Sequence, residues 1–408
     1  MQLIPVTVES IQVGKPLPFP LMDKDGILLA RKSFVVATRQ DLIDMQARGN
    51  GLFVDVENSE AHHRAYVGQL HGLLRDNKPL GEIADAQITA APAPREAEER
   101  EHPDWLDLQV QCNALLRDGQ SALFMARLER LQMQLDQFSR RNPDGTLFAL
   151  IYLSTTETRM YSATHAMLVS VMCALAAREV LNWSPEMEST LCRAALTMNL
   201  GMTDLQDRLS RQTEALTAAQ RRAIDQHANR SMEQLMALGV TDAVWLQAVA
   251  QHHTQAPGPL ASRTPAERMA RLIQRADMFA ARLAPRSSRV PVAPAAAMQA
   301  CYFDENKKID EAGAALIKAV GIYQPGSFVK LASDEIGVVV RRGANTTTPR
   351  TAVLINRNGM PTGEPLVRDT ALKEYKVVAS VAHRDVKVQF NLDRLLPFTV
   401  TAKSDRPW

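Results

Sequence analysis

The stretch TPAERMARLIQRADMFAARL, residues 264–283, carries the signals that decide the fold of this chain. Thr264 with Glu267 three residues later forms a capping box, and Pro265 takes the first helical position, where its missing N–H costs nothing. Apolar residues then recur at helical spacing. They are Leu272, Ile273, Ala276, Phe279, Ala280 and Leu283. The stretch predicts a capped amphipathic helix with one face in a core.

Two other helix starts are equally well marked. Ser184 precedes Pro185 at a first helical position, and Thr217 with Gln220 forms another capping box. The pattern is helical almost throughout from Trp105 to about Ile322. Residues 105–322 therefore predict a helical bundle.

After Gly321 the period changes. Short apolar and β-branched runs cover 327–331, 336–340 and 352–355, with turn signals at Ser333-Asp334 and Asn358-Gly359. We expect residues 323–408 to form a small β-rich domain.

The first segment predicts a small mixed module over residues 1–86. A hairpin is expected from Leu21 to Leu29 around the turn Asp-Lys-Asp-Gly, followed by a helix that Thr38 opens and a strand at 52–54. Residues 87–104 mix alanine, proline and charge without periodicity, which indicates a linker. The expected fold class is mainly α: a helical bundle with a small α/β N-terminal module and a β-rich C-terminal domain.

Composition limits the partners. The 408 residues suggest two or three domains, since one domain usually has about 100–200. The 47 basic and 45 acidic residues leave a net charge of +2, so we expect neither nucleic acid nor an anionic membrane as a partner.

The cysteines and the N-terminus favour a soluble, cytoplasmic protein. The cysteines form no CxxC pair and lie in mostly apolar surroundings, as free thiols in a reducing compartment do. They are Cys112, Cys173, Cys192 and Cys301. The sequence shows no basic leader with an apolar core and no run of about 18 apolar residues.

Four histidines and one aspartate are the candidates for chemistry. Apolar residues follow His165 at three, four and seven positions along the chain, so its ring points along a buried stripe. His227 shares a face with Leu235, and His252-His253 ends a helix. Asp277 lies within the apolar stripe quoted above, where an unpaired carboxylate would cost several kcal/mol. Imidazole and carboxylate from several helices are the ligands that divalent transition metals favour.

Each candidate also has a structural interpretation. An inward histidine can be a hydrogen-bonded core residue, and His252-His253 can be a polar helix end that complements the dipole. Asp277 can pair with Arg275 or Arg282, or with an arginine from another helix. If all five residues are structural, they need not converge in space.

The order of these residues resembles the HD-GYP family, a bacterial branch of the HD phosphohydrolases that hydrolyses cyclic di-GMP. The resemblance covers about residues 145–345, and PLPFPLMDKDGILLARKSFVV (16–36) is similar to segments preceding such domains. It implies an HD-domain bundle in which an early histidine, a His-Asp doublet, a third histidine, a His-His pair and a late aspartate hold two or three iron or manganese ions. Five residues match the family's positions other than the doublet: His165, His227, His252, His253 and Asp277.

The doublet position departs from the family. In LTMNLGM, residues 196–202, Met198 and Asn199 stand where the family has His-Asp. Asn199 is neutral, and Met198 offers a soft thioether where a hard or borderline ion prefers imidazole. Without the bridging carboxylate, two adjacent cations lose the charge that offsets their repulsion. We expect no binuclear site.

Other parts of the family's mechanism are missing too. After His253 the family continues with glutamate and a glycine-rich loop ending in Gly-Tyr-Pro, whereas this chain reads TQAPGPL over residues 254–260. Tyr161 lies one helical turn before His165, where family members with a third metal carry glutamate. Met202 stands where the family often has lysine.

These departures imply a degenerate HD-GYP protein that has lost phosphodiesterase activity, holds no cofactor and acts by binding. The expected partner is a signalling protein such as a diguanylate cyclase, or cyclic di-GMP itself, with a homodimer as one option for assembly. Arg282, Arg286 and Arg289 could contact phosphates, or form a solvated loop. The rival interpretation is an active hydrolase with one divalent ion (Fe, Mn or Zn) held by His165, His227, His253 and Asp277.

Overall fold

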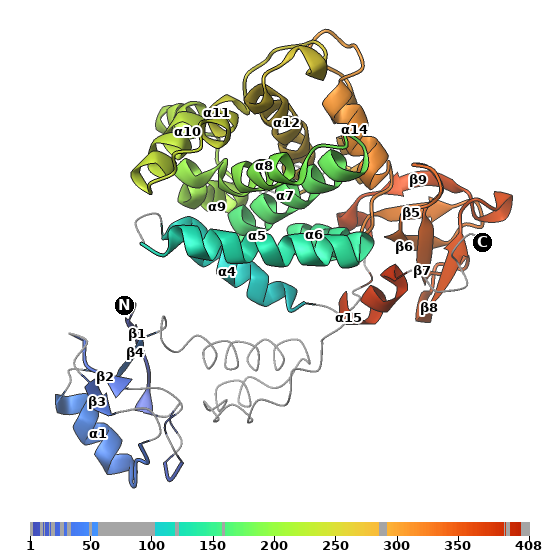
Figure 1. Ribbon diagram of the computed structural model, residues 1–408. Coiled ribbons are helices and arrows are strands. Elements are labelled where there is room, and N and C mark those ends of the chain that lie inside the picture. The colour runs from blue at the N-terminus through green and yellow to red at the C-terminus, as the bar shows by residue number, and fades with distance from the viewer. Residues whose placement is uncertain are drawn as a thin grey trace. The chain divides into compact units, whose positions relative to one another are not determined.

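The computed structural model describes residues 3–55 and 103–400, apart from gaps at 9–10, 12, 16, 18–20, 25–27, 31–33, 49–50, 119–121, 157–159, 285–291, 387 and 389–391. The chain divides into two compact units, Met1–Glu101 and His102–Trp408. It is mostly helical with two small sheets, which confirms the mainly α class (Figure 1). Among the described helices, none is both long and apolar enough to cross a membrane.

In its described residues, the first unit contains a four-stranded antiparallel sheet and one helix. The strands are β1 (Leu3–Pro5), β2 (Leu21–Met22), β3 (Leu28–Ala30) and β4 (Phe53–Asp55), in the order β1-β4-β2-β3. β2 pairs with β3 as the predicted hairpin requires, although turn residues 25–27 lie outside the described residues. The helix α1 (Arg39–Arg48) begins after Thr38, whose hydroxyl and N–H exchange bonds with Asp41. Of the predicted linker, only Pro103 and Asp104 are described, and Asp104 caps the next helix.

Helices dominate the second unit. In chain order they are α4 (Trp105–Arg117), α5 (Phe124–Arg141), α6 (Pro143–Thr156), α7 (Tyr161–Glu179), α8 (Pro185–Thr197), η2 (Leu200–Met202), α9 (Thr203–Arg211), α10 (Ala218–Ala237), α11 (Ala243–Gln251), η3 (Leu260–Ser262), α12 (Pro265–Leu283), α13 (Pro294–Tyr302) and α14 (Glu311–Val320). The predicted caps form: Thr217 and Thr264 each make a complete capping box, and Ser184 accepts a bond from Met187 N.

The central helix is α7. Every residue from Tyr161 to Ala177 is buried, as a helix with apolar residues all round requires. α7 packs against α6, α8, α12 and α14, so a side chain on α7 can reach elements far away in the sequence.

A five-stranded antiparallel sheet follows the helices. Its strands are β5 (Phe328–Leu331), β6 (Ile336–Arg341), β7 (Arg350–Ile355), β8 (Pro361–Asp369) and β9 (Val377–Val381), in the order β8-β7-β6-β5-β9. The predicted strands are β5, β6 and β7, and both predicted turns hold a residue with positive φ, Asp334 at 63° and Gly359 at 76°. The edge strands β8 and β9 were not predicted. A short helix α15 (Leu392–Leu395) comes after the sheet.

The sheet completes the core of the helices. Phe328, Val338 and Leu354 belong to the same apolar cluster as α7 and α12. Arg342 reinforces this contact, because its guanidinium bonds Asp144 at 2.7 Å and Glu179 at 2.8 Å. The helices and the sheet therefore form one compact body.

Candidate functional site

His165 and Asp277 form a pair at the centre of the bundle. His165 lies on α7 and Asp277 on α12, and His165 Nε2 is 2.7 Å from Asp277 Oδ1. Because the carboxylate can only accept, the imidazole donates from Nε2 and presents Nδ1 to the Tyr161 hydroxyl at 3.4 Å. Both nitrogens of His165 are therefore engaged.

The pairing explains how a carboxylate is tolerated here. Burial by itself would raise the pKa of Asp277, but the hydrogen bond that the carboxylate accepts from His165 is the main cause that holds that pKa below its usual range. Arginine does not supply the counter-charge: Arg275 pairs with Glu305 and Asp310, and Arg282 donates to Met278 O at 3.1 Å. The alternative pairing of Asp277 with Arg275 or Arg282 is wrong.

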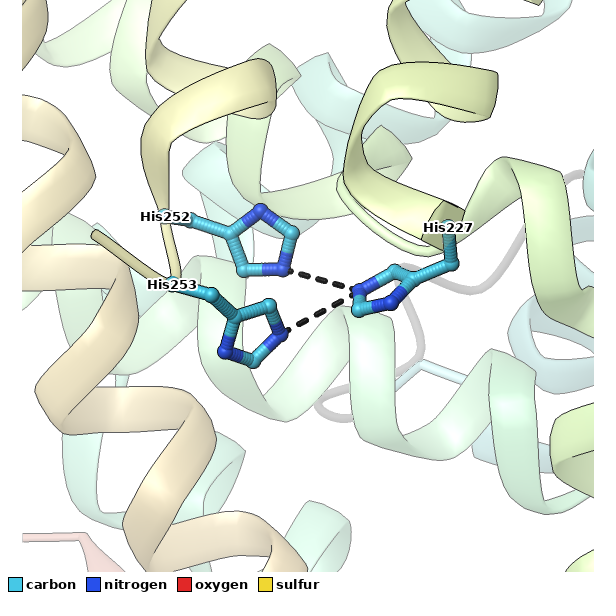
Figure 2. A group of neighbouring side chains, drawn as sticks. All are labelled: His227, His252 and His253. Carbon is cyan, nitrogen blue, oxygen red and sulfur yellow. Dashed lines mark hydrogen bonds between the residues drawn. The ribbon is translucent and has the colours of Figure 1, made fainter. Parts of the chain in front are cut away.

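Three other histidines converge from two helices. His227 lies on α10, while His252 and His253 follow the last turn of α11. Nε2 of His227 is 3.2 Å from Nε2 of His252 and 3.2 Å from Nε2 of His253. Figure 2 shows the three rings turned toward one another. Their ligand atoms all lie within 4.8 Å of one another, and within the described chain this is the grouping that could hold a metal ion.

The backbone fixes two of these rings. His227 Nδ1 lies 2.5 Å from Ile224 O, and His252 Nδ1 lies 2.6 Å from Val249 O, in each case a carbonyl three residues earlier. A carbonyl only accepts, so each Nδ1 carries the proton and each Nε2 presents a bare lone pair. Two bare lone pairs at 3.2 Å cannot bond each other, and a cation between them would satisfy both.

Electrostatics keep the same rings neutral. Burial is the main cause that lowers the pKa of His252 to about 3, with the rings of His253 and His227 acting in the same direction. Burial also lowers the pKa of His227. Neutral imidazole is the form that binds metals, so the donor chemistry of the group fits a divalent ion.

The five predicted residues thus fall into two sets. His227, His252 and His253 form the imidazole group, whereas His165 and Asp277 bond each other. The sets are close enough for Asp277 to affect the pKa of both His227 and His252. The four residues of the mononuclear alternative, His165, His227, His253 and Asp277, do not form one group of donors in the described chain.

The doublet position comes just before a turn that is bonded to α10. Met198 follows α8 and is completely buried, in the same apolar cluster as Leu196 and Val249. The next turn, η2, is fixed to α10 through Ser231, which accepts from Gly201 N at 2.9 Å and donates to His227 O at 2.8 Å. The turn that follows the Met-Asn pair is therefore bonded to the helix that carries His227.

The segment after His253 is held on both sides. Thr254 O accepts from Gln274 of α12 at 3.2 Å, and Leu260 N donates to Glu311 of α14 at 2.7 Å. Arg286 and Arg289, predicted to contact phosphates, lie outside the described residues.

Sequence reasoning missed a buried ionic network on α12. Arg271 bonds Asp310 at 2.7 Å and Glu305 at 2.9 Å, and the side chains of Arg271 and Asp310 are 2% and 3% exposed. The signal available was a pair of arginines, Arg271 and Arg275, one turn apart in a helix with a long apolar stripe.

Comparisons with known proteins add little. No family model matches the chain, and a search of curated proteins found no match. One solved structure, Bd1817, a HDG"Y"P protein from Bdellovibrio bacteriovorus, is similar at 14% sequence identity and a TM-score of 0.43, over 77% of this chain and 98% of that one. Family membership does not follow from these comparisons.

Proposed function

We propose that this chain is a degenerate protein of the HD-GYP type that does not hydrolyse cyclic di-GMP and acts by binding. The observation that carries the proposal is Met198, whose side chain is completely buried in the apolar core where that family has a metal-binding histidine. A side chain in this position packs instead of ligating.

The neighbouring residues point the same way. Asn199 is uncharged, and the imidazole group contains no carboxylate within the described residues. A binuclear centre needs an anionic ligand between its ions to offset their repulsion. Asp277 is not free for that role, since it accepts the bond from His165.

The test of lost catalysis uses purified full-length protein supplied with Mn²⁺. We expect no turnover of cyclic di-GMP by the wild type. The double variant Met198→His, Asn199→Asp tests whether the doublet alone is missing, and Met198→Leu is its matched control because it keeps the buried volume without a ligand. Turnover by the wild type would contradict the proposal.

The test of binding has two arms. Calorimetry with cyclic di-GMP measures recognition of the dinucleotide, and capture of a purified diguanylate cyclase by the immobilised chain measures recognition of a protein. We expect one arm to be positive. Failure of both, in protein shown to be folded, would remove the binding function.

A second candidate function has one observation in its favour. The imidazole group could hold a single ion, and a bound ion of this kind supplies an activated water to a phosphodiester. The protein would contribute His227, His252 and His253 as ligands. Cleavage of an activated phosphodiester by the wild type, and its loss in His227→Gln, would favour this candidate.

A further inference from the structure

We propose that His227, His252 and His253 form a mononuclear site with three neutral imidazole ligands that selects Zn²⁺ or a similar late transition ion over Mn²⁺ and Fe²⁺, with His165 and Asp277 outside the coordination shell. This inference rests on the proposed function, since it describes the metal chemistry that remains when a two-ion centre is lost.

The first support is how the rings are held. His227 and His252 use the same device: each donates its Nδ1 proton to a carbonyl of its own helix and directs Nε2 into the group (Figure 2). Ligating histidines in metal sites fix their orientation by such bonds. The rings are therefore positioned as ligands by short-range contacts within α10 and α11.

The second support is spacing. Zn–N bonds of about 2.0–2.1 Å at tetrahedral angles place ligand nitrogens about 3.3 Å apart. The two Nε2 separations from His227 are both 3.2 Å. All three ligand nitrogens lie within 4.8 Å of one another, so one ion could contact the three rings after the side chains adjust.

The third support is the type of ligand, which decides the selectivity. Mn²⁺ is suited to carboxylate and water, whereas imidazole suits Zn²⁺, and affinity for a given set of nitrogen ligands rises from Mn²⁺ through Fe²⁺ to the later ions. The group contains imidazoles only within the described residues. It therefore lacks the oxygen ligand that would favour an early ion.

His165 and Asp277 have other roles in this arrangement. His165 Nε2 donates to Asp277 and its Nδ1 faces the Tyr161 hydroxyl, so ligation would require breaking a bond of 2.7 Å. Asp277 influences the imidazole group through its charge, which partly offsets that of a cation there.

The site is open on one side. His252 and His227 are buried, but His253 is exposed. Three protein ligands leave one position of a tetrahedral ion. Because neutral ligands leave the ion its full charge, the open position would take water or an anionic oxygen of a ligand.

The experiment measures metal selectivity in full-length protein stripped with chelator. Competition against a chromophoric chelator should give one Zn²⁺ per chain, bound at least about 100-fold more tightly than Mn²⁺. Substitution with Co²⁺ gives a readout independent of activity, because a four-coordinate cobalt centre absorbs visible light far more strongly than a six-coordinate one. We expect the intense spectrum.

The variants separate ligands from neighbours. His253→Gln changes an exposed residue, so the fold should persist while Zn²⁺ affinity falls by at least about 100-fold. His383→Gln, which alters a histidine bonded to Gly326 O, is the matched control and should bind normally. Asp277→Asn and His165→Gln should each change affinity by less than about tenfold, because neither residue bonds any of the three ligands.

Three results would overturn the inference: tighter binding of Mn²⁺ than of Zn²⁺, absence of Zn²⁺ binding by folded protein, or loss of binding in His165→Gln as large as in His253→Gln. The His165 variant decides the question if Asp277→Asn does not fold. Hydrolysis of cyclic di-GMP would instead contradict the proposed function and would leave the metal selectivity unaffected, so the two failures are distinguishable.

Discussion

His165 on α7 and Asp277 on α12 are joined by a hydrogen bond of 2.7 Å, although 112 residues separate them in the chain. The histidine side chain is 1% exposed and the aspartate side chain 16% exposed, so water screens the pair only slightly. This bond connects the central helix to the helix whose capping box and apolar stripe are the clearest fold signals in the sequence.

Removal of the carboxylate should therefore destabilise the bundle. Asp277→Ala leaves the His165 donor without its partner, and we expect a loss of about 2–4 kcal/mol in the free energy of unfolding, somewhat below the range for a completely buried pair. Urea denaturation with chelator present measures it. Asp334→Asn, which removes the charge from the exposed pair with Lys330 and suits the same left-handed backbone, is the control and should change stability little. Equal effects of the two variants would contradict this role of Asp277.

A side chain at position 201, in place of Gly201, should destabilise the protein. A Cβ atom there would lie 2.8 Å from both Arg230 Cβ and Ser231 N, beside the bond that fixes η2 to α10. Gly201→Ala should cost about 1–3 kcal/mol, because part of the obstruction is backbone. Gly363→Ala is the matched control, since nothing lies within 4 Å of its Cβ position. Thermal unfolding measures the stability of both variants. A Gly201→Ala protein as stable as Gly363→Ala would contradict the prediction.

The buried ionic network on α12 should show strong coupling. Arg271→Met leaves the Asp310 carboxylate buried with less compensation, and we expect a loss of about 3–5 kcal/mol. Adding Asp310→Asn should recover part of that loss, because the amide removes the charge and can still accept the α14 cap bond from Gly313 N. Denaturant titrations of the two single variants and the double variant give the coupling energy. Additive effects would show that the two residues act independently.

His383 should contribute to acid sensitivity. Burial lowers its pKa to about 4, while its Nε2 donates to Gly326 O at 3.0 Å. Between about pH 6.5 and pH 4 the unfolded chain binds a proton that the folded chain does not, so stability falls as pH falls, by on the order of 1 kcal/mol per pH unit at most. His383→Gln keeps a donor and removes the titration.

The measurement is the free energy of unfolding at several pH values in chelator. In the wild type and in His383→Gln alike, His227 and His252 also lower the stability as the pH falls, because their pKa values are lowered too. Only the difference between wild type and His383→Gln is therefore diagnostic, and it should grow as the pH is lowered from 6.5 to 4. A difference that stays constant across this window would show that His383 takes up a proton in the folded protein as readily as in the unfolded chain.

Local signals predicted the elements well. Thr217 and Thr264 lie within three residues of the groups they bond, so their capping boxes can be read from sequence. The strands β5 to β7 combine β-branched residues with buried positions. The edge strand β8 contains proline, glycine and glutamate and has no buried residue, so it lacks the apolar signal of a strand.

Non-local contacts could not be predicted in the same way. Arg271 and Asp310 are 39 residues apart, and no pattern along the chain assigns one to the other. The sequence indicated that Asp277 needs a partner, but the choice of His165 over Arg275 depends on how α7 and α12 pack. Likewise, the family resemblance grouped five residues, whereas the packing divides them into a pair and a group of three.

The place of β9 beside β5 has a consequence for biosynthesis. Phe328 and Val338 complete the apolar cluster of the helices, yet the sheet that holds them is finished only after residue 381 has been translated. Until then, the surface of α6 that packs against β6 is not covered by a finished sheet. The apolar cluster of the second unit is therefore completed only late in synthesis.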